Sequence, residues 1–132
     1  MTDKFPKGAG DHILKVHKCS EGGLLYEFFR DVKFGQMAVR IVPPGKTAGG
    51  HSHNMREWWL VFMGTAVVRL GYPNGIEESL YVSGEDLKII PLPPRTGHEI
   101  KNVGEDDMGF IFWAEKLYDP ESHDKQPWSW EE

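Results

Sequence analysis

Hydrophobic residues in this chain occur in short runs separated by turn residues. Runs rich in Val, Ile, Leu, Phe, Tyr and Trp alternate with segments such as PPGKTAGG, GYPNG, SGED and NVGEDD. Short apolar runs between turn signals are typical of β-strands, and no window of useful length has the 3.6-residue period of an amphipathic helix. We therefore predict strands over residues 13–17, 24–30, 36–42, 57–62, 65–70, 76–82, 87–90, 98–102 and 108–114.

Many short strands at regular spacing indicate an all-β sandwich or barrel, and the length of 132 residues favours a single domain. We expect residues 1–10, which are polar and contain glycine, to be flexible, residues 11–119 to form the barrel, and residues 120–132 to form a C-terminal tail. Trp128 and Trp130 in this tail would expose a large apolar area if it were loose. We therefore expect both to dock on this subunit or on a neighbour.

The charge and cysteine content exclude several classes of function. The chain has 15 basic and 20 acidic residues and a net charge of −5, whereas nucleic acids and anionic membranes attract basic surfaces. The longest apolar run is far too short to cross a bilayer, and the N-terminus lacks the apolar segment of a signal peptide. The single cysteine, Cys19, excludes an internal disulfide framework. We expect a cytoplasmic protein with neither nucleic acid nor membrane as its partner.

Three histidines and a glutamate have the spacing of metal ligands. His51 and His53 are two residues apart and so share one face of an extended chain, and Glu57 keeps that parity. Glu57 opens the most hydrophobic predicted strand, where an unpaired carboxylate would cost several kcal/mol. His98 heads another predicted strand. Such a set suits a divalent transition metal with one or two positions left open. A structural histidine pair and a salt bridge from Arg56 to Glu57 are the alternatives.

The frame around these residues resembles the signature motifs of the cupin superfamily. The first motif, G-x(5)-H-x-H-x(3)-E-x(6)-G, is matched without a gap at Gly45, His51, His53, Glu57 and Gly64. The second, G-x(5)-P-x-G-x(2)-H-x(3)-N, is matched with three extra residues before the proline and an arginine at its second glycine, at Gly84, Pro93, Arg95, His98 and Asn102. The resemblance implies a double-stranded β-helix, the jelly-roll cupin barrel.

Longer stretches are similar to one branch of that superfamily. Residues 27–36, 43–64, 83–115 and 118–124 resemble the C-terminal cupin domain of capsular-polysaccharide biosynthesis reductase/epimerases, and the wider group of nucleotide-sugar epimerases with RmlC-like barrels. There are departures: Trp113-Ala114 is followed by Glu115-Lys116 instead of Asn-Glu, and His123 interrupts the proline-aspartate ending.

This resemblance implies a metal-bearing nucleotide-sugar epimerase or isomerase of polysaccharide or deoxysugar biosynthesis. Its chemistry is proton abstraction next to the ketone of a 4-keto-6-deoxy nucleotide sugar, and the resulting enolate oxygen needs stabilisation. Zinc, nickel or iron held by His51, His53, Glu57 and His98 can polarise that oxygen. An Fe-dependent dioxygenase and a non-enzymatic sugar-binding barrel are the alternatives, because a fold does not fix a function. Related small cupins also imply a homodimer.

The remaining candidates are assigned from position alone. The general base is not identified by the sequence, and the candidates on the early predicted strands are His17, Tyr26 and Glu27. For the diphosphate we consider cations near strand ends, and Arg95 is favoured because it lies three residues before His98. For each candidate the alternative is a structural role or a solvated charge. The predicted substrate-binding residues are Arg95, Arg40, Arg69, Trp59 and Trp113.

Overall fold

A computed structural model describes residues 15–27, 35–116 and 125–130, and these residues form strands and turns. The all-β prediction is confirmed. Within the described ranges there is no helix with the length and apolar character needed to span a membrane. Residues 1–10, predicted to be flexible, lie outside the described residues, as does part of the predicted tail.

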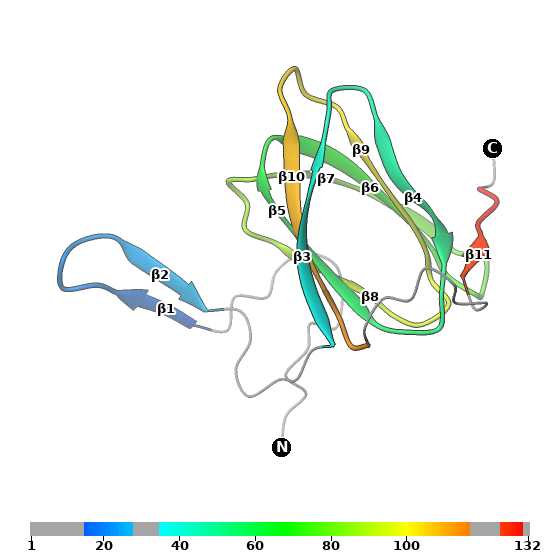
Figure 1. Ribbon diagram of the computed structural model, residues 1–132, viewed down its shortest axis with the longest axis horizontal. Coiled ribbons are helices and arrows are strands. Elements are labelled where there is room, and N and C mark those ends of the chain that lie inside the picture. Colours follow the sequence, from blue (N-terminus) through cyan, green and yellow to red (C-terminus); the bar gives the residue numbers. More distant parts are fainter. Residues whose placement is uncertain (1–14, 28–34, 117–124, 131–132) are drawn as a thin grey trace.

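The strands form two larger antiparallel sheets and one separate hairpin (Figure 1). The hairpin consists of β1 (Lys15–Lys18) and β2 (Leu24–Glu27). The four-stranded sheet has the order β3 (Gln36–Val42), β10 (Met108–Ala114), β5 (Glu57–Met63) and β8 (Ile89–Leu92). The five-stranded sheet has the order β11 (Gln126–Pro127), β4 (Thr47–Ser52), β9 (Gly97–Asn102), β6 (Thr65–Gly71) and β7 (Glu77–Ser83).

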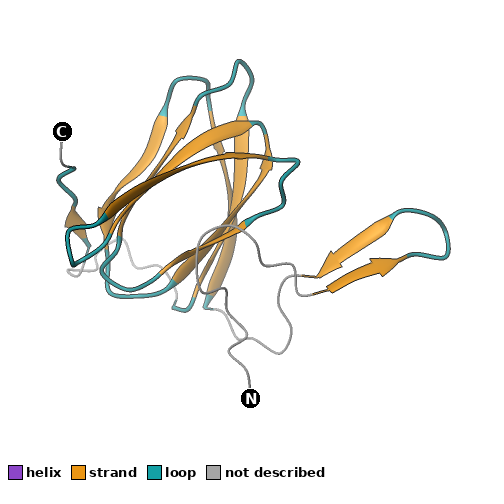
Figure 2. Cartoon of the chain, turned by 180° about the vertical axis from the view of Figure 1, so that it is seen from behind, coloured by secondary structure: helices purple, strands orange, loops and turns teal. Residues whose placement is uncertain are grey.

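The two larger sheets face each other across one hydrophobic core. Alternate residues of β6, such as Val68 and Leu70, are fully buried and meet Val61 and Phe110 of the opposite sheet in one cluster. This alternation is the period of two that a strand with one buried face requires. Seen from behind, the strands of both sheets wrap around this shared interior (Figure 2). The core therefore fixes the two sheets as the walls of one barrel.

The outer face of the four-stranded sheet is also apolar. Trp58, Leu60, Ile89 and Trp113 form a second buried cluster on that side. Residues of both parities on β5 are therefore buried, which explains why this strand reads as a continuous hydrophobic run. Further along the same face, β3 leaves its apolar side chains exposed.

Nine predicted strands correspond to β1–β3 and β5–β10, with ends that differ by up to two residues where both ends are described. Among the described residues, two strands were missed. β4 contains Gly49 and Gly50 and no apolar run, so its sequence indicated a turn. β11 is only two residues long and contains Pro127, which a pattern search over longer windows does not detect.

Candidate functional site

A bulge in β4 places His51 beside β9. Gly49 pairs with Glu99, but the next pair is His51 with His98, so Gly50 is the extra residue. Both glycines have positive φ, and a Cβ on Gly49 would lie 2.7 Å from the carbonyl oxygen of His98. Glycine therefore permits both the bulge and the close approach of the two strands.

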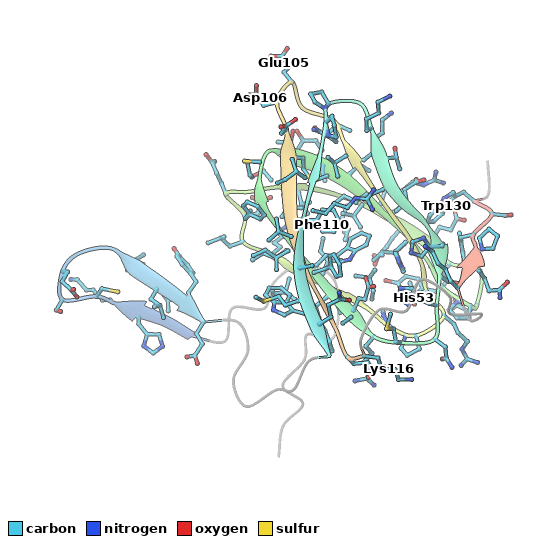
Figure 3. All side chains as sticks on the ribbon, in the orientation of Figure 1. His53, Glu105, Asp106, Phe110, Lys116 and Trp130 are labelled. Atoms are coloured by element: carbon cyan, nitrogen blue, oxygen red, sulfur yellow. The ribbon has the colours of Figure 1, made fainter. Side chains whose placement is uncertain are left out.

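Three histidines converge on the interior side of this bulge. His53 follows directly after β4 and is buried (Figure 3). The ring centroids are 4.8 Å apart for His51 and His98, 4.9 Å for His53 and His98, and 5.6 Å for His51 and His53. One nitrogen from each ring lies within 4.8 Å of the other two. The structure thus brings together the three predicted imidazoles.

Glu57 lies beside this histidine cluster at the start of β5. Its Oε1 is 3.0 Å from Nε2 of His53, and its Oε2 accepts a hydrogen bond of 3.0 Å from Nε1 of Trp59. The Trp59 ring also meets His98 edge-on, with centroids 5.2 Å apart. Two donors thus compensate a carboxylate that is only 9% exposed. Arg56, the alternative partner, is itself exposed.

Burial, nearby charges and hydrogen bonds together set the protonation of this site. It lowers the pKa of His98 to about 4, and burial together with the charge of Lys125 lowers the pKa of His51 to about 4. Burial alone would raise the pKa of Glu57, but the hydrogen bond from His53 and the neighbouring imidazoles outweigh it and lower that pKa. At neutral pH a carboxylate therefore lies beside neutral His51 and His98.

The chemistry of this donor set fits a divalent cation. The Nδ1 of His98 is 3.0 Å from the carbonyl oxygen of Thr96, which can only accept a hydrogen bond, so the Nε2 of the neutral ring carries the lone pair. The Nδ1 of His53 is buried with no hydrogen-bond partner among the described residues. Such an unpaired buried nitrogen is unfavourable and needs an explanation such as a ligand. Neutral imidazoles and a carboxylate are the usual ligands of zinc and related ions.

These groups line a cavity of about 220 Å³ between the two sheets. Ligand pockets usually measure about 300–1,000 Å³, so this cavity is sized for one ring rather than for a whole nucleotide. Its apolar wall includes Trp59, Phe110 and Phe112, and the cations among its described lining residues are Arg40 and Lys125. The site therefore combines a small apolar chamber with positive charge.

Of the five predicted substrate-binding residues, Arg40 and Trp59 line the cavity, and the other three do not. Arg69 points to the outer face of its sheet, because the residues on either side of it point into the core. Trp113 packs in the second cluster for the same reason of parity. Arg95 is exposed in the turn after β8, where its backbone N–H donates a 2.8 Å hydrogen bond to the carbonyl oxygen of His53.

The three candidate bases lie on the β1–β2 hairpin and do not line the cavity of this chain. Nε2 of His17 is 3.1 Å from Oε1 of Glu27, so these two candidates pair with each other. Tyr26 is on the same hairpin. The sequence placed these residues on early strands, but it could not show that those strands pair with each other instead of joining a barrel sheet.

From the sequence we missed one of the two cations among the described residues that line the cavity, Lys125. The available signal was the pair of tryptophans just after it, which were expected to dock. They do dock on this chain: Trp128 lies against Gly71 and Gly97, and the Trp130 ring stacks under Arg69.

Comparisons with known proteins place this chain in a family. The profile of the polysaccharide biosynthesis C-terminal domain matches residues 18–126. A UDP-2-acetamido-2,6-beta-L-arabino-hexul-4-ose reductase of Pseudomonas aeruginosa is 34% identical over 124 residues, which are 91% of this chain and 32% of that protein. The capsular polysaccharide assembling protein CapF of Staphylococcus aureus is 32% identical with a TM-score of 0.69, covering 87% of this chain and 34% of CapF. The chain spans about a third of the length of these relatives.

More distant structures establish the fold. The 3'-monoepimerase ChmJ of Streptomyces bikiniensis has a TM-score of 0.74 at 16% identity, covering 91% of this chain and 69% of ChmJ. The 3,5-epimerase RmlC of Legionella pneumophila has a TM-score of 0.69 at 18% identity, covering 82% of this chain and 66% of RmlC. The predicted jelly-roll cupin barrel is confirmed. This chain belongs to the polysaccharide biosynthesis C-terminal domain family and has an RmlC-like cupin fold.

Proposed function

We propose that this barrel is a metal-dependent epimerase or isomerase of nucleotide sugars. The observation that carries the proposal is the cluster of His51, His53 and His98 beside an ionised Glu57, in a small apolar cavity. The relative from Pseudomonas aeruginosa is named for a UDP-linked hexul-4-ose, which is a sugar with a ketone at C4. A ketone activates the hydrogens on its neighbouring carbons, which is the chemistry that epimerisation needs.

The proposed cofactor is a divalent transition metal (zinc, nickel or iron) held by His51, His53, Glu57 and His98. Bound there, the metal would act as a Lewis acid on the ketone oxygen. Trp59 holds the Glu57 carboxylate through its 3.0 Å hydrogen bond, and Thr96 holds the His98 ring in the tautomer with a free Nε2. Phe110 and Phe112 form part of the apolar wall of the cavity, and an apolar wall strengthens the charge interactions beside it.

Incubation with a 4-keto-6-deoxy nucleotide sugar in deuterated water tests this function. We expect deuterium at C3 or C5 of the sugar with the metal-loaded protein, and loss of that exchange after chelation. The Glu57→Gln variant, which removes the anion but keeps the shape, should lose metal and exchange together. Metal binding without exchange would rule out the epimerase for the sugars tried. Oxygen consumption dependent on Fe²⁺ would instead favour a dioxygenase.

We also propose that the chain forms a homodimer through its N-terminal hairpin. An isolated two-stranded hairpin is only marginally stable in water, and β1–β2 exposes Val16, Leu24 and Leu25. Among the described strands, β3 is at the edge of the four-stranded sheet, and it exposes Met37 (64%) and Val39 (58%). The hairpin of a second copy would cover this apolar edge.

Light scattering tests the dimer. We expect a mass of twice 15.1 kDa for the native chain and the mass of one chain for Val39→Lys. The matched control is Tyr81→Lys, an exposed position on β7 of the other sheet, which should leave the mass unchanged. A native mass of 15.1 kDa would contradict the proposal.

A further inference from the structure

The C-terminal strap, residues 125–130, includes the edge strand of the five-stranded sheet, beside β4 (Figure 1). Its strand β11 pairs with β4 so that Gln126 opposes Ser52 and Pro127 opposes His51. The backbone N–H of Trp128 then donates a 3.0 Å hydrogen bond to the carbonyl oxygen of Gly50. The strap is therefore attached to the bulge that positions His51.

Trp128 anchors the strap in a slot between two glycines. Gly71 of β6 and Gly97 of β9 are direct cross-strand partners, and a Cβ on either one would overlap the Trp128 ring. Neither glycine has a positive φ, so backbone conformation does not require glycine at these positions. We conclude that the missing side chains make room for the indole.

Trp130 provides a second anchor. The guanidinium carbon of Arg69 lies 4.3 Å from the centre of the Trp130 ring, and Arg69 is held in turn by Glu99 at 3.6 Å and Glu77 at 3.9 Å. Cation–π contacts of this kind contribute modestly when exposed. Arg69, which the sequence suggested for substrate binding, thus contacts the strap.

Both anchors follow Lys125, and Lys125 lines the cavity. Arg40, the other cation of the described lining, lies on β3 of the opposite sheet. The strap therefore adds a positive charge to a chamber that already holds Arg40.

We propose that Lys125 binds the anionic diphosphate of the substrate and that Trp128 is its positioning residue. This inference rests on the proposed function for the class of ligand. The cavity holds about one ring, so the diphosphate of a bound nucleotide sugar must lie towards its opening. A lysine ammonium is a mobile point charge on a flexible stem, and it suits phosphate oxygens. The strap thus completes the substrate site.

Calorimetric titration with UDP, with uridine as the phosphate-free reference, tests this role. Lys125→Gln should weaken UDP binding about tenfold, the size expected for one charge-assisted hydrogen bond, and leave uridine binding unchanged. Lys101→Gln, an exposed lysine on β9 that does not line the cavity, is the matched control and should bind UDP like the native chain.

The positioning role has its own test. Trp128→Ala, and independently Gly71→Ala, which fills the slot, should weaken UDP binding by a similar factor although neither changes a charge. Adding Lys125→Gln to either variant should then have little further effect, because the lysine is already displaced. Two variants with opposite changes in volume protect the test against one that does not fold.

The outcomes separate the two proposals. Native binding of UDP that Lys125→Gln leaves intact would overturn the role of Lys125 and leave the proposed function standing. Equal losses for UDP and uridine in Lys125→Gln would likewise contradict a diphosphate contact. Failure of the native chain to bind UDP would overturn the role of Lys125, whereas the proposed function is decided separately by the deuterium exchange.

Discussion

His98 and Asn102 lie four residues apart on β9, and both are buried, with exposed fractions of 2% and 0%. Asn102 is fully paired. Its amide nitrogen donates 2.8 Å hydrogen bonds to the carbonyl oxygens of Val42 and Asp106, and its Oδ1 accepts a 2.9 Å hydrogen bond from the N–H of Gly104. His98 has one hydrogen bond, to Thr96, and otherwise faces two imidazoles and an indole.

The difference shows that burial alone does not separate structural from functional polar groups. Asn102 ties together the turns before and after it, at the end of the barrel where Asp106 lies, far from His53 (Figure 3). Its hydrogen-bonding capacity is used within the protein. The histidine end leaves a ring nitrogen unpaired. A closed polar network stabilises a fold, and an open one is available to a ligand.

The largest expected effect on stability is at the closed end of β9, where Asn102 lies. Asn102→Ala leaves the buried carbonyl oxygen of Val42, and the part-buried carbonyl oxygen of Asp106 and N–H of Gly104, without their partner. Each such loss costs about 1–3 kcal/mol. We expect the free energy of unfolding to fall by about 5 kcal/mol, measured by urea denaturation of the ion-free protein. A loss below about 1 kcal/mol would show that Asn102 does not hold these turns together.

Metal should stabilise the protein by binding at the open end of β9, where His98 meets His51 and His53. A ligand at a thousandfold excess over its Kd stabilises a protein by about 4 kcal/mol, so we expect zinc to raise the Tm of the native chain and a chelator to reverse the rise. His98→Gln should abolish the rise, whereas a milder variant of the other end, Asn102→Asp, should keep it. An equal zinc-dependent rise in His98→Gln would place the ion elsewhere.

The sequence predicted the histidine cluster well and the residues around the cavity less well. The cupin spacing correctly grouped His51, His53 and His98. Alternation along a strand shows which side chains share a face, and the family motif shows which strands carry the ligands. It could not foresee that Arg69 and Trp113 point away from the cavity, since one step along a strand reverses the face. It also missed β4 and Lys125, because their positions depend on a glycine bulge and on a slot between Gly71 and Gly97 that have no local pattern.

Acid should lower the free energy of unfolding through the histidines of the cavity. The pKa values of His51 and His98 fall from 6.5 to about 4 on folding. Between these values the unfolded chain binds protons that the folded chain does not, so the free energy of unfolding falls as the pH drops from 6.5 to 4. His98 alone should contribute up to about 3 kcal/mol, and the more exposed His51 should contribute less.

Urea denaturation of the ion-free protein at several pH values between 7.5 and 4 measures this loss. Glu57, whose pKa is lowered from 4.5, adds to the loss as the pH falls below 4.5, where the carboxylate of the unfolded chain becomes protonated before that of the folded chain. His98→Gln should flatten the slope between pH 6.5 and 4. A slope as steep as that of the native chain would mean that other groups carry the acid sensitivity.

Two glycines give the smallest and sharpest comparison. Gly45, whose amide donates to the carbonyl oxygen of Asn102, and Gly49 at the histidine bulge both have positive φ, near 77° and 93°. A Cβ on Gly45 meets nothing within 4 Å, whereas one on Gly49 would collide with the backbone of His98. Gly45→Ala should therefore cost about 1 kcal/mol from backbone strain, and Gly49→Ala about 2 kcal/mol from strain and displacement together.

Zinc titration of both variants then shows whether each substitution disturbs the histidine cluster. Gly49→Ala moves β4 against β9 and so separates His51 from His98, and its zinc affinity should fall about tenfold or more. Gly45→Ala should bind zinc like the native chain, because it disturbs only the end of the barrel that Asn102 already closes. If both variants bound zinc equally well, the bulge would not be what positions His51, and the contrast between the two ends of β9 would lose its structural cause.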